Sequence, residues 1–440
     1  MALEQNLPDP TTEAGRATTR PDDAADPRAP APRIPSPGAN GDGYVWFTAE
    51  TGSWFGAFGM QGVLFSWILV GELDAESQWV GTAQTSSMLP SLFLLLLGGV
   101  IADRFDPRRL LVVLHLLAPL PVVLLAGAAA TDSLSIPGVI AFALAMGTLT
   151  ALGNPARDAL LARVAGADLM GAVAGMTAVQ FACQATGAIT AGLARLVGSP
   201  LMLCAHACVL LSGAAFALRV PARTPAERAE AARHHLDASL GATLRGMRQG
   251  LSIVLHTPEL RGPLTGVFAV GIFFIGPFTV GVPLVIREIY AGNVDQLAVA
   301  LTLFPLGTIS GSLVLRRTGM TRKGRSQLLA LGVASAFQAC LGTGIPFPLF
   351  AGAVFAWGLA GAVFINASRT IFQEHAPAAY RGRVLATYQL GFMGGGPIGA
   401  LATGFAVPLV GLGGAFGLAA GAMATLVLAM SLFSRVPRIP

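Results

Sequence analysis

Ionisable side chains are rare within the apolar segments of this 440-residue chain, so each of them is a candidate for chemistry. Glu50 stands near the start of the first long apolar segment, and His115 and His206 lie inside two later ones. A buried carboxylate or imidazole can bind and release a proton as its surroundings change. Glu50 is the best candidate for that role. The alternative is a carboxylate at the boundary of the apolar region, and lone histidines in such segments are more often packed than reactive.

Enzymatic chemistry has little support in the sequence. It contains no HExxH metal motif and no GxxxxGK[ST] phosphate-binding loop, so neither a zinc hydrolase nor an ATPase is expected. The cysteines Cys183, Cys204, Cys208 and Cys340 fit no metal-ligand spacing and behave as small apolar side chains. We therefore expect no cofactor, no bound metal and no enzymatic activity, and a membrane-embedded enzyme is the weakest alternative.

Long segments without charge must position these few groups. Hydrophobic residues make up 53% of the chain and charged residues only 12%. Eight uncharged segments are long enough for the roughly 20-residue helix that crosses a bilayer: residues 51–71, 77–102, 110–131, 133–156, 169–194, 196–218, 262–286 and 296–315. Two longer ones, 326–368 and 384–434, each hold two spans divided by the turns in GTGIPFPLF and VPLVGLGG. The sequence thus predicts an all-α membrane protein with twelve transmembrane helices.

The basic residues predict the orientation in the membrane. Of the 28 lysines and arginines, only Arg195 and Arg287 fall in the odd-numbered loops. By the positive-inside rule, both termini then lie in the cytoplasm, and the membrane is the plasma (inner) membrane. The net charge of +5 follows from this topology, so nucleic acid is not an expected partner.

The hydrophilic segments divide the chain further. Residues 1–43 contain eight prolines and no apolar core segment, which predicts a disordered cytoplasmic tail. Two six-helix bundles follow at 44–220 and 262–434, joined by a linker at 221–261 and followed by a short cytoplasmic C-terminus at 435–440. Within the linker, apolar residues recur every three to four positions, which predicts an amphipathic helix at the membrane surface. A simple tether explains the linker, although a regulatory role is the alternative.

An internal repeat relates the two bundles. Asn154 and Arg157 follow the fourth span, and Asn366 and Arg369 follow the tenth with the same three-residue step. The offset of 212 residues runs in the same direction along the chain. Such a repeat is typical of two halves packed about an axis along the membrane normal.

A charged cluster at residues 98–110, GGVIADRFDPRRL, follows the second span. It places Gly99, Asp103, Arg104, Arg108 and Arg109 in the turn before the third span. Arginines suit the cytoplasmic surface, but an acid gains nothing there. At the end of a span, however, it can bond to a helix N-terminus or to an arginine and act as a conformational latch. A plain topology anchor would leave Asp103 unexplained.

This cluster resembles the loop between helices two and three of the major facilitator superfamily. NPAR after the fourth span and RGRV, with Arg381 and Arg383, before the eleventh are similar to the macrolide-efflux and enterobactin-exporter branch. The resemblance implies the major facilitator fold, in two pseudo-symmetric six-helix bundles, and transport by alternating access. It also implies that Asp103 lies at the N-terminus of the eleventh helix near Arg383, with Arg157 as its partner. The second half lacks the acid, because Leu315 occupies that position.

Polar and aromatic residues in the spans are candidates for a central cavity. Polar groups in lipid are costly and often functional, although helix packing explains any single one equally well. The candidates are Gln61, Gln180, Gln184, Phe273, Phe274, Trp357, Tyr388 and Gln389. A cavity with amides and aromatics but few charges suits a bulky amphiphilic molecule.

The function predicted from these features is secondary active transport. The best-supported form is a proton-coupled exporter of amphiphilic small molecules of the drug, macrolide or siderophore class, acting as a monomer in the lipid bilayer. A nutrient or metabolite importer of the same fold is the alternative. The expected partners of the transporter are the small-molecule substrate, the bilayer and, through the resemblance, protons.

Overall fold

The computed structural model of the chain describes residues 41–166, 169–224, 240–377 and 380–440, with side chains given except at 95–104, 169–170, 174, 240 and 242–244. The predicted N-terminal tail and the middle of the linker therefore lie outside the described residues. Within the described part every regular element is a helix, in agreement with the predicted fold class.

The first half is built from eight helices and one π-helical segment. In chain order they are α1 (Gly41–Trp67), η2 (Ile68–Glu72), α2 (Ser77–Arg104), α3 (Pro107–Leu117), α4 (Pro119–Ala130), α5 (Ile136–Val164), α6 (Leu169–Ala191), α7 (Ala194–Val197) and α8 (Ser199–Arg219). Local sequence explains several boundaries. Asp106 accepts hydrogen bonds from the amides of Arg108 and Arg109 and so caps α3, and Pro119 separates α3 from α4.

The second half begins after α10 (Leu240–His256), the helix that forms the described end of the linker. Its elements are α11 (Pro258–Val270), η4 (Gly271–Ile275), η5 (Pro277–Gly281), α12 (Val282–Leu284), η6 (Val285–Ile289), α13 (Val294–Thr318), α14 (Lys323–Leu341), α15 (Phe347–His375), α16 (Arg381–Phe433) and η8 (Val436–Arg438). An Asn293–Gln296 capping box starts α13.

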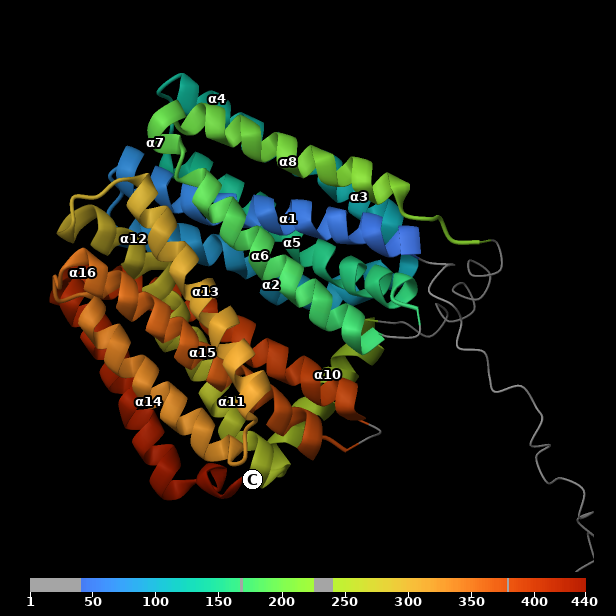
Figure 1. The fold of residues 1–440 in the computed structure, drawn as a ribbon, viewed down its shortest axis with the longest axis vertical. Helices are drawn as coiled ribbons and strands as arrows, with labels where there is room; N and C mark the ends of the chain where they lie inside the picture. Colours follow the sequence, from blue (N-terminus) through green and yellow to red (C-terminus); the bar gives the residue numbers. More distant parts are fainter. Residues whose placement is uncertain (1–40, 167–168, 225–239, 378–379) are drawn as a thin grey trace, which may run out of the picture. The chain divides into compact units, whose positions relative to one another are not determined.

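The described residues contain nine helices long and apolar enough to cross a membrane. One of them, α16, is interrupted at Gly411, where φ is 73°, so it holds the two spans predicted there, and the break falls in VPLVGLGG. The turn between α14 and α15 falls in GTGIPFPLF, also as predicted. Adding α2 and α14, which run alongside the others, gives twelve (Figure 1).

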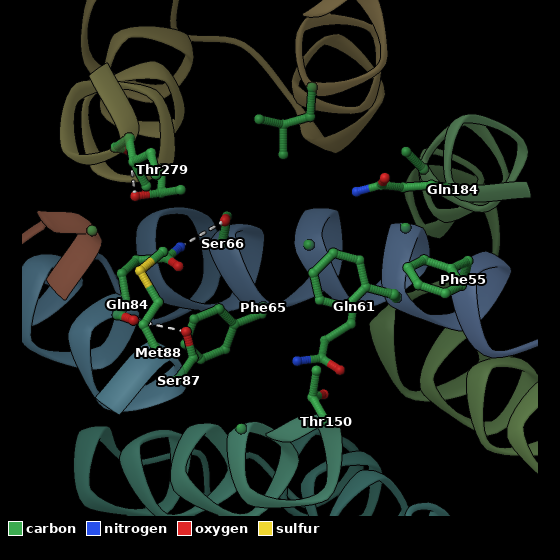
Figure 2. Close-up of a pocket in the computed structure, with 18 of the residues that line it drawn as sticks. Phe55, Gln61, Phe65, Ser66, Gln84, Ser87, Met88, Thr150, Gln184 and Thr279 are labelled. Carbon is green, nitrogen blue, oxygen red and sulfur yellow. Dashed lines mark hydrogen bonds between the residues drawn. The ribbon is translucent and has the colours of Figure 1, made fainter. Parts of the chain in front are cut away.

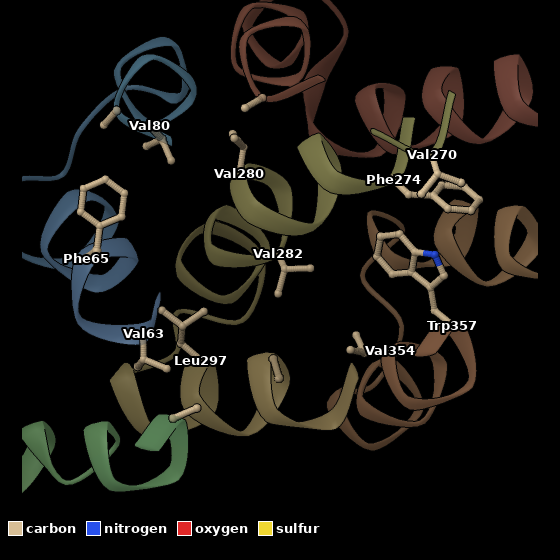
Figure 3. Packing of buried hydrophobic residues seen from close by; sticks show 14 of the residues in the cluster. Val63, Phe65, Val80, Val270, Phe274, Val280, Val282, Leu297, Val354 and Trp357 are labelled. Atoms are coloured by element: carbon tan, nitrogen blue, oxygen red, sulfur yellow. The ribbon is translucent and has the colours of Figure 1, made fainter. Parts of the chain in front are cut away.

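The two halves repeat the same pairings. In the first half α1 packs on α6, α2 on α5, and α3–α4 on α8; in the second, η4 and α11 pack on α16, α13 on α15, and α14 on α16. Figure 1 shows α1–α8 and α11–α16 as two neighbouring groups. Buried residues of both groups form one apolar cluster, which includes Val63 and Leu297 (Figure 3).

The helical assembly has two ends, which are named by the elements that lie there. The α10 end holds the start of α1 at Gly41 and the linker helix, and the far end holds the turns after η2 and η6. Direct polar contacts join the halves toward the far end: the Ser77 hydroxyl donates to the carbonyl of Gly404 (2.9 Å), and Arg195 pairs with Asp295 (2.7 Å). Deeper in, Thr85 donates to the carbonyl of Pro397 (3.0 Å). These contacts join the two halves at that end.

Candidate functional site

A cavity of about 460 Å³ lies between the two halves, midway along the helices. Its walls come from α1, α2, α5 and α6 of the first half and from η4, η5, α13 and α16 of the second. Figure 2 shows Gln61 directed toward Thr150 of α5, and Gln184 entering from α6. The sequence predicted both glutamines as cavity residues, and both line it.

One face of α2 contributes lining residues that were not predicted from the sequence. Gln84, Ser87, Met88 and Ser91 of α2 line the cavity, and their spacing of three, one and three residues places them on one helix face. Gln84 donates to the hydroxyl of Ser66 (3.2 Å), and Ser87 donates to the backbone carbonyl of Gln84 (2.7 Å). Their spacing was a usable signal, although small polar residues also occur in ordinary helix packing.

The rest of the lining is mostly apolar, with several aromatic rings, and carries no formal charge. The ring side chains that line the cavity are Trp54, Phe55, Phe58, Phe65, Phe278 and Phe392. Among the described lining residues none is Asp, Glu, Lys or Arg. Such a cavity can hold an uncharged or amphiphilic molecule by apolar contact and orient it through amides and hydroxyls.

A buried ionic cluster lies one layer behind this wall. Glu50 is fully buried, and its Oε1 contacts His115 Nε2 at 2.8 Å and Arg157 Nε at 3.2 Å. Its Oε2 accepts a hydrogen bond from the hydroxyl of Thr51 (3.2 Å). Glu50 is thus buried inside the protein and is not a solvent-exposed carboxylate. Three helices, α1, α3 and α5, contribute to the cluster.

Both ring nitrogens of His115 face an oxygen atom. Its Nδ1 lies 2.8 Å from the carbonyl oxygen of Leu210, and a carbonyl only accepts, so Nδ1 must carry hydrogen. The contact between Nε2 and Glu50 then requires one more proton, placed on the imidazole or on the carboxyl. The pair is therefore suited to hold one proton beyond neutral histidine and carboxylate, in a site closed to solvent.

Close packing makes this geometry possible. A Cβ added at Gly213 of α8 would lie 2.0 Å from Cε1 of His115, so only glycine lets the imidazole fit between α3 and α8. Leu210, whose carbonyl accepts from His115, precedes Gly213 by three residues on the same helix face. The α8 backbone thereby sets both the position and the tautomer of His115.

Trp54 connects the ionic cluster to the cavity. Its indole lines the cavity, its centroid lies 4.1 Å from Cζ of Arg157, and it meets the His115 ring edge-to-face at 5.2 Å. Glu50 and Trp54 are four residues apart on α1, which places them on one face. Nη1 and Nη2 of Arg157 have no hydrogen-bond partner among the described residues, so the cation rests on the aromatic ring.

The predicted latch is only partly described. The side chains of Gly99, Asp103 and Arg104 lie outside the described residues, so the latch stays a prediction. Arg157, expected beside Asp103, pairs with Glu50 in the described part of the chain, because burial of its guanidinium requires a nearby carboxylate.

The other residues of the predicted latch lie at helix ends or in the cavity wall. Arg108 donates to the carbonyls of Ala217 (3.2 Å) and Leu218 at the C-terminus of α8, and the amide of Arg109 bonds to Asp106. Asn154 of α5 lines the cavity.

The second-half counterparts are placed separately from the ionic cluster. Asn366 donates to Ser312 (3.2 Å) and to the carbonyl of Ala362 (2.8 Å). Arg369 is exposed and lies within electrostatic range of Asp158. Arg383 donates to Gln249 of α10 (2.5 Å), while Arg381 is exposed at the start of α16.

The remaining predicted cavity residues do not line the described cavity. Trp357 is buried against Phe274 (5.6 Å between ring centroids) and Phe278 (5.9 Å). Trp357 and Phe274 therefore form a layer behind the cavity wall, and Phe278 belongs to the wall itself. Four others lie outside the lining as well: Gln180, half-buried on α6; Phe273, half-buried on η4; Tyr388, which contacts the Ser368 hydroxyl at 3.2 Å; and Gln389, exposed on α16.

The seventh span is irregular where it meets the cavity. Three π-helical segments, η4, η5 and η6, interrupt it, and Ile275, Phe278 and Thr279 from this stretch line the cavity. Thr279 donates to the carbonyl of Ile275 (2.9 Å). Single π turns inside helices frequently mark functional sites, and here they orient Phe278 inward.

Comparison with known proteins identifies the fold. Residues 43–440 match the family described as transmembrane secretion effector, within the major facilitator superfamily. No curated protein matches the sequence significantly. The superfamily predicted from the loop motif is thereby confirmed, while the macrolide and enterobactin branch is not.

Solved structures similar to this one are transporters with low sequence identity. The nucleoside transporter NupG superposes with a TM-score of 0.70 at 14% identity, covering 89% of this chain and 98% of its own. A D-xylose–proton symporter gives 0.67 at 15% identity, covering 90% and 98%. The inward-open xylose transporter XylE from E. coli gives 0.65 at 13% identity, covering 88% and 95%. At these identities the likeness shows the fold alone.

Proposed function

This chain belongs to the transmembrane secretion effector family and is a multi-pass secondary transporter of the major facilitator type, and from that premise we propose that it exports uncharged or amphiphilic small molecules in exchange for protons. The observation that carries the proposal is the buried contact of 2.8 Å between Glu50 and His115 directly behind the cavity wall, which is suited to hold a proton. A carrier that exchanges a proton for substrate needs such a group near the binding site.

The coupling mechanism that we propose passes through Trp54. In the proton-loaded cluster, the carboxylate of Glu50 is balanced by protonated His115 and by Arg157. Loss of the proton leaves Glu50 and Arg157 as the ion pair and removes one positive charge from beside Trp54. Because the indole touches both Arg157 and the cavity, its orientation would then differ between the two protonation states, and substrate affinity with it.

The topology in this proposal follows the arginines. Both termini and the α10 end would face the cytoplasm of the plasma membrane, and the contacts that join the halves toward the far end favour exchange of the cavity with the cytoplasmic side. An exporter loads its substrate from that side. The protein acts as a monomer, and the latch at Asp103 stabilises the opposite, outward-open state.

A nutrient importer is the second candidate. Amides and hydroxyls such as Gln61, Gln84 and Thr150 in the cavity could bond to a polyhydroxylated molecule. The NupG and xylose transporters of the same fold are named for such substrates. The apolar and uncharged majority of the lining favours the amphiphilic substrate.

The test uses purified protein in liposomes carrying an imposed pH gradient. Transport of a fluorescent amphiphile should follow the proton gradient in the wild type. In Glu50→Gln the substrate should still bind and exchange between the two sides, but accumulation driven by the gradient should disappear. The control is Asp158→Asn, which removes an exposed acid of α5.

Gradient-driven accumulation in Glu50→Gln equal to that of the wild type would refute the coupling role. Uptake of nucleosides or sugars, with no amphiphile transport, would favour the importer instead.

A further inference from the structure

A second cavity, separate from the central one, opens at the α10 end. Its volume is about 980 Å³, and it lies between α10, the start of α11 and both spans of α16. Its lining is dominated by apolar side chains: Met247, Leu251 and Leu255 of α10; Leu264 and Phe268 of α11; Leu390 and Phe433 of α16.

The linker helix α10 has two apolar faces, and only one is covered. On the packed face, Val254 is fully buried, and a Cβ added at Gly250 would lie 2.5 Å from the carbonyl of Arg383. On the neighbouring face, Leu251 is 44% exposed and Leu255 is 53% exposed. The second face therefore needs an apolar partner that the described chain does not supply.

Two arginines give the groove a positive charge. Arg248 and Arg261 both line it and are exposed. Neither makes a side-chain hydrogen bond or an ion pair with any residue in the described part of the chain. The nearest acid in sequence, Glu259, faces Arg435 at 3.9 Å. The groove thus combines apolar walls with two unpaired cations.

We propose that this groove is a binding site for an anionic diacyl phospholipid from the leaflet at the α10 end. The acyl chains would cover Leu251, Leu255 and Phe268, and the phosphate would pair with Arg248 and Arg261. A basic pocket between helices on the cytoplasmic side is suited to such a headgroup. A zwitterionic lipid would satisfy the walls, but its headgroup cation would weaken the attraction between its phosphate and the two arginines.

Occupancy of the site bears on transport because α16 contributes to both cavities. Leu390 and Gly391 line the groove, and Phe392 and Met393, the next residues along α16, line the central cavity. A lipid that holds α10 against α16 would stabilise the state in which these two cavities coexist. Anionic lipid is then a structural partner of the carrier.

Native mass spectrometry of the purified full chain tests the proposal. The probes are phosphatidylglycerol and phosphatidylcholine with the same acyl chains, and inorganic phosphate alone. We expect phosphatidylglycerol to bind in preference to phosphatidylcholine, and Arg248→Gln with Arg261→Gln to bind it roughly 25-fold more weakly. That figure follows from about 1 kcal/mol for each arginine and a tenfold change for every 1.4 kcal/mol.

Two control variants separate the groove from general surface charge. Arg316→Gln with Arg317→Gln removes the same charge from exposed positions on α13 and should leave the preference intact. Leu251→Asn with Leu255→Asn keeps both arginines but should weaken binding, because it makes the open face of α10 polar. Both double variants are at exposed positions, so folding should be preserved.

Three results would overturn the proposal. The first is equal binding of the two lipids, which would indicate an ordinary lipid-facing surface. The second is full competition by inorganic phosphate, which would indicate an anion site without acyl contacts. The third is an equal loss in the α13 control, which would make the effect one of net charge alone.

Discussion

The two halves of the molecule share one fold but differ in the chemistry of their interiors. In the first half, Glu50, His115 and Arg157 form a buried ionic cluster. The residues 212 positions later are Gly262, Gln327 and Arg369. Gln327 is fully buried and neither of its amide atoms has a partner in the described part of the chain, while Arg369 is exposed.

This difference shows how a repeated structure can divide its tasks. The second half keeps a polar side chain at the position of His115 but lacks the acid, so it cannot share a proton there. In its place it has an aromatic layer in which Trp357 contacts Phe274, Phe278 and Phe304. One half thus carries the ionisable groups, and the other contributes neutral, rigid packing beside the same cavity.

The largest effect should come from removing the acid. Glu50→Ala leaves the Arg157 guanidinium buried without a counter-charge, and breaking a buried pair in this way costs about 3–5 kcal/mol. Chemical unfolding in detergent should show that loss. Arg369→Ala, at the exposed equivalent of Arg157, should cost less than about 1 kcal/mol. Equal losses would mean that the halves do not differ as described.

The next effect should come from making the first half resemble the second. His115→Gln replaces the proton-sharing imidazole by the residue found at position 327. Proton transfer by a positioned side chain is typically worth about 100-fold or more, so gradient-driven transport should fall by about that factor. The measurement is the initial rate in liposomes at several pH values. An unchanged rate and pH profile would show that His115 only packs.

A smaller effect, of opposite sign, is expected from the second half. Gln327→Leu removes a buried amide that has no partner, and an unsatisfied polar group costs about 1–3 kcal/mol. The variant should therefore be more stable by up to that amount, with transport unchanged. Thermal unfolding measures it. Destabilisation would indicate that Gln327 bonds to a group that forms in another conformation.

The smallest effect concerns the proposed latch. Asp103→Asn should slow transport about fivefold, corresponding to about 1 kcal/mol for one charge-assisted contact, while membrane insertion stays intact. Leu315→Asp, at the equivalent position of the second half, should not compensate for it. Transport at the wild-type rate in Asp103→Asn would remove the latch from the mechanism.

The sequence predicted the spans well because charge-free length is a strong signal in a membrane protein. Even the two breaks inside the longest segments were located, since Gly411 and the turn before Phe347 fall in motifs rich in glycine and proline. The repeat was also visible, because Asn154 and Arg157 recur with exact spacing. These features depend on composition and order along the chain alone.

The site was harder to predict because it depends on how each helix is rotated. Gln61 and Gln184 were identified, but Trp357 was expected in the cavity and lies in the layer behind it. His115 was expected to be packed, and only the structure brings it within 2.8 Å of Glu50, 65 residues earlier in the chain. Nothing in the local sequence of either residue encodes that contact.

The uncharged lining of the central cavity has an electrical consequence. If the transported molecule is neutral, the proposed exchange for a single proton would move one net charge per cycle. The membrane potential then contributes about 2.3 kcal/mol per 100 mV to each turnover, in addition to the difference in pH. A carrier built in this way would go on pumping in cells whose internal and external pH are equal, powered by voltage alone.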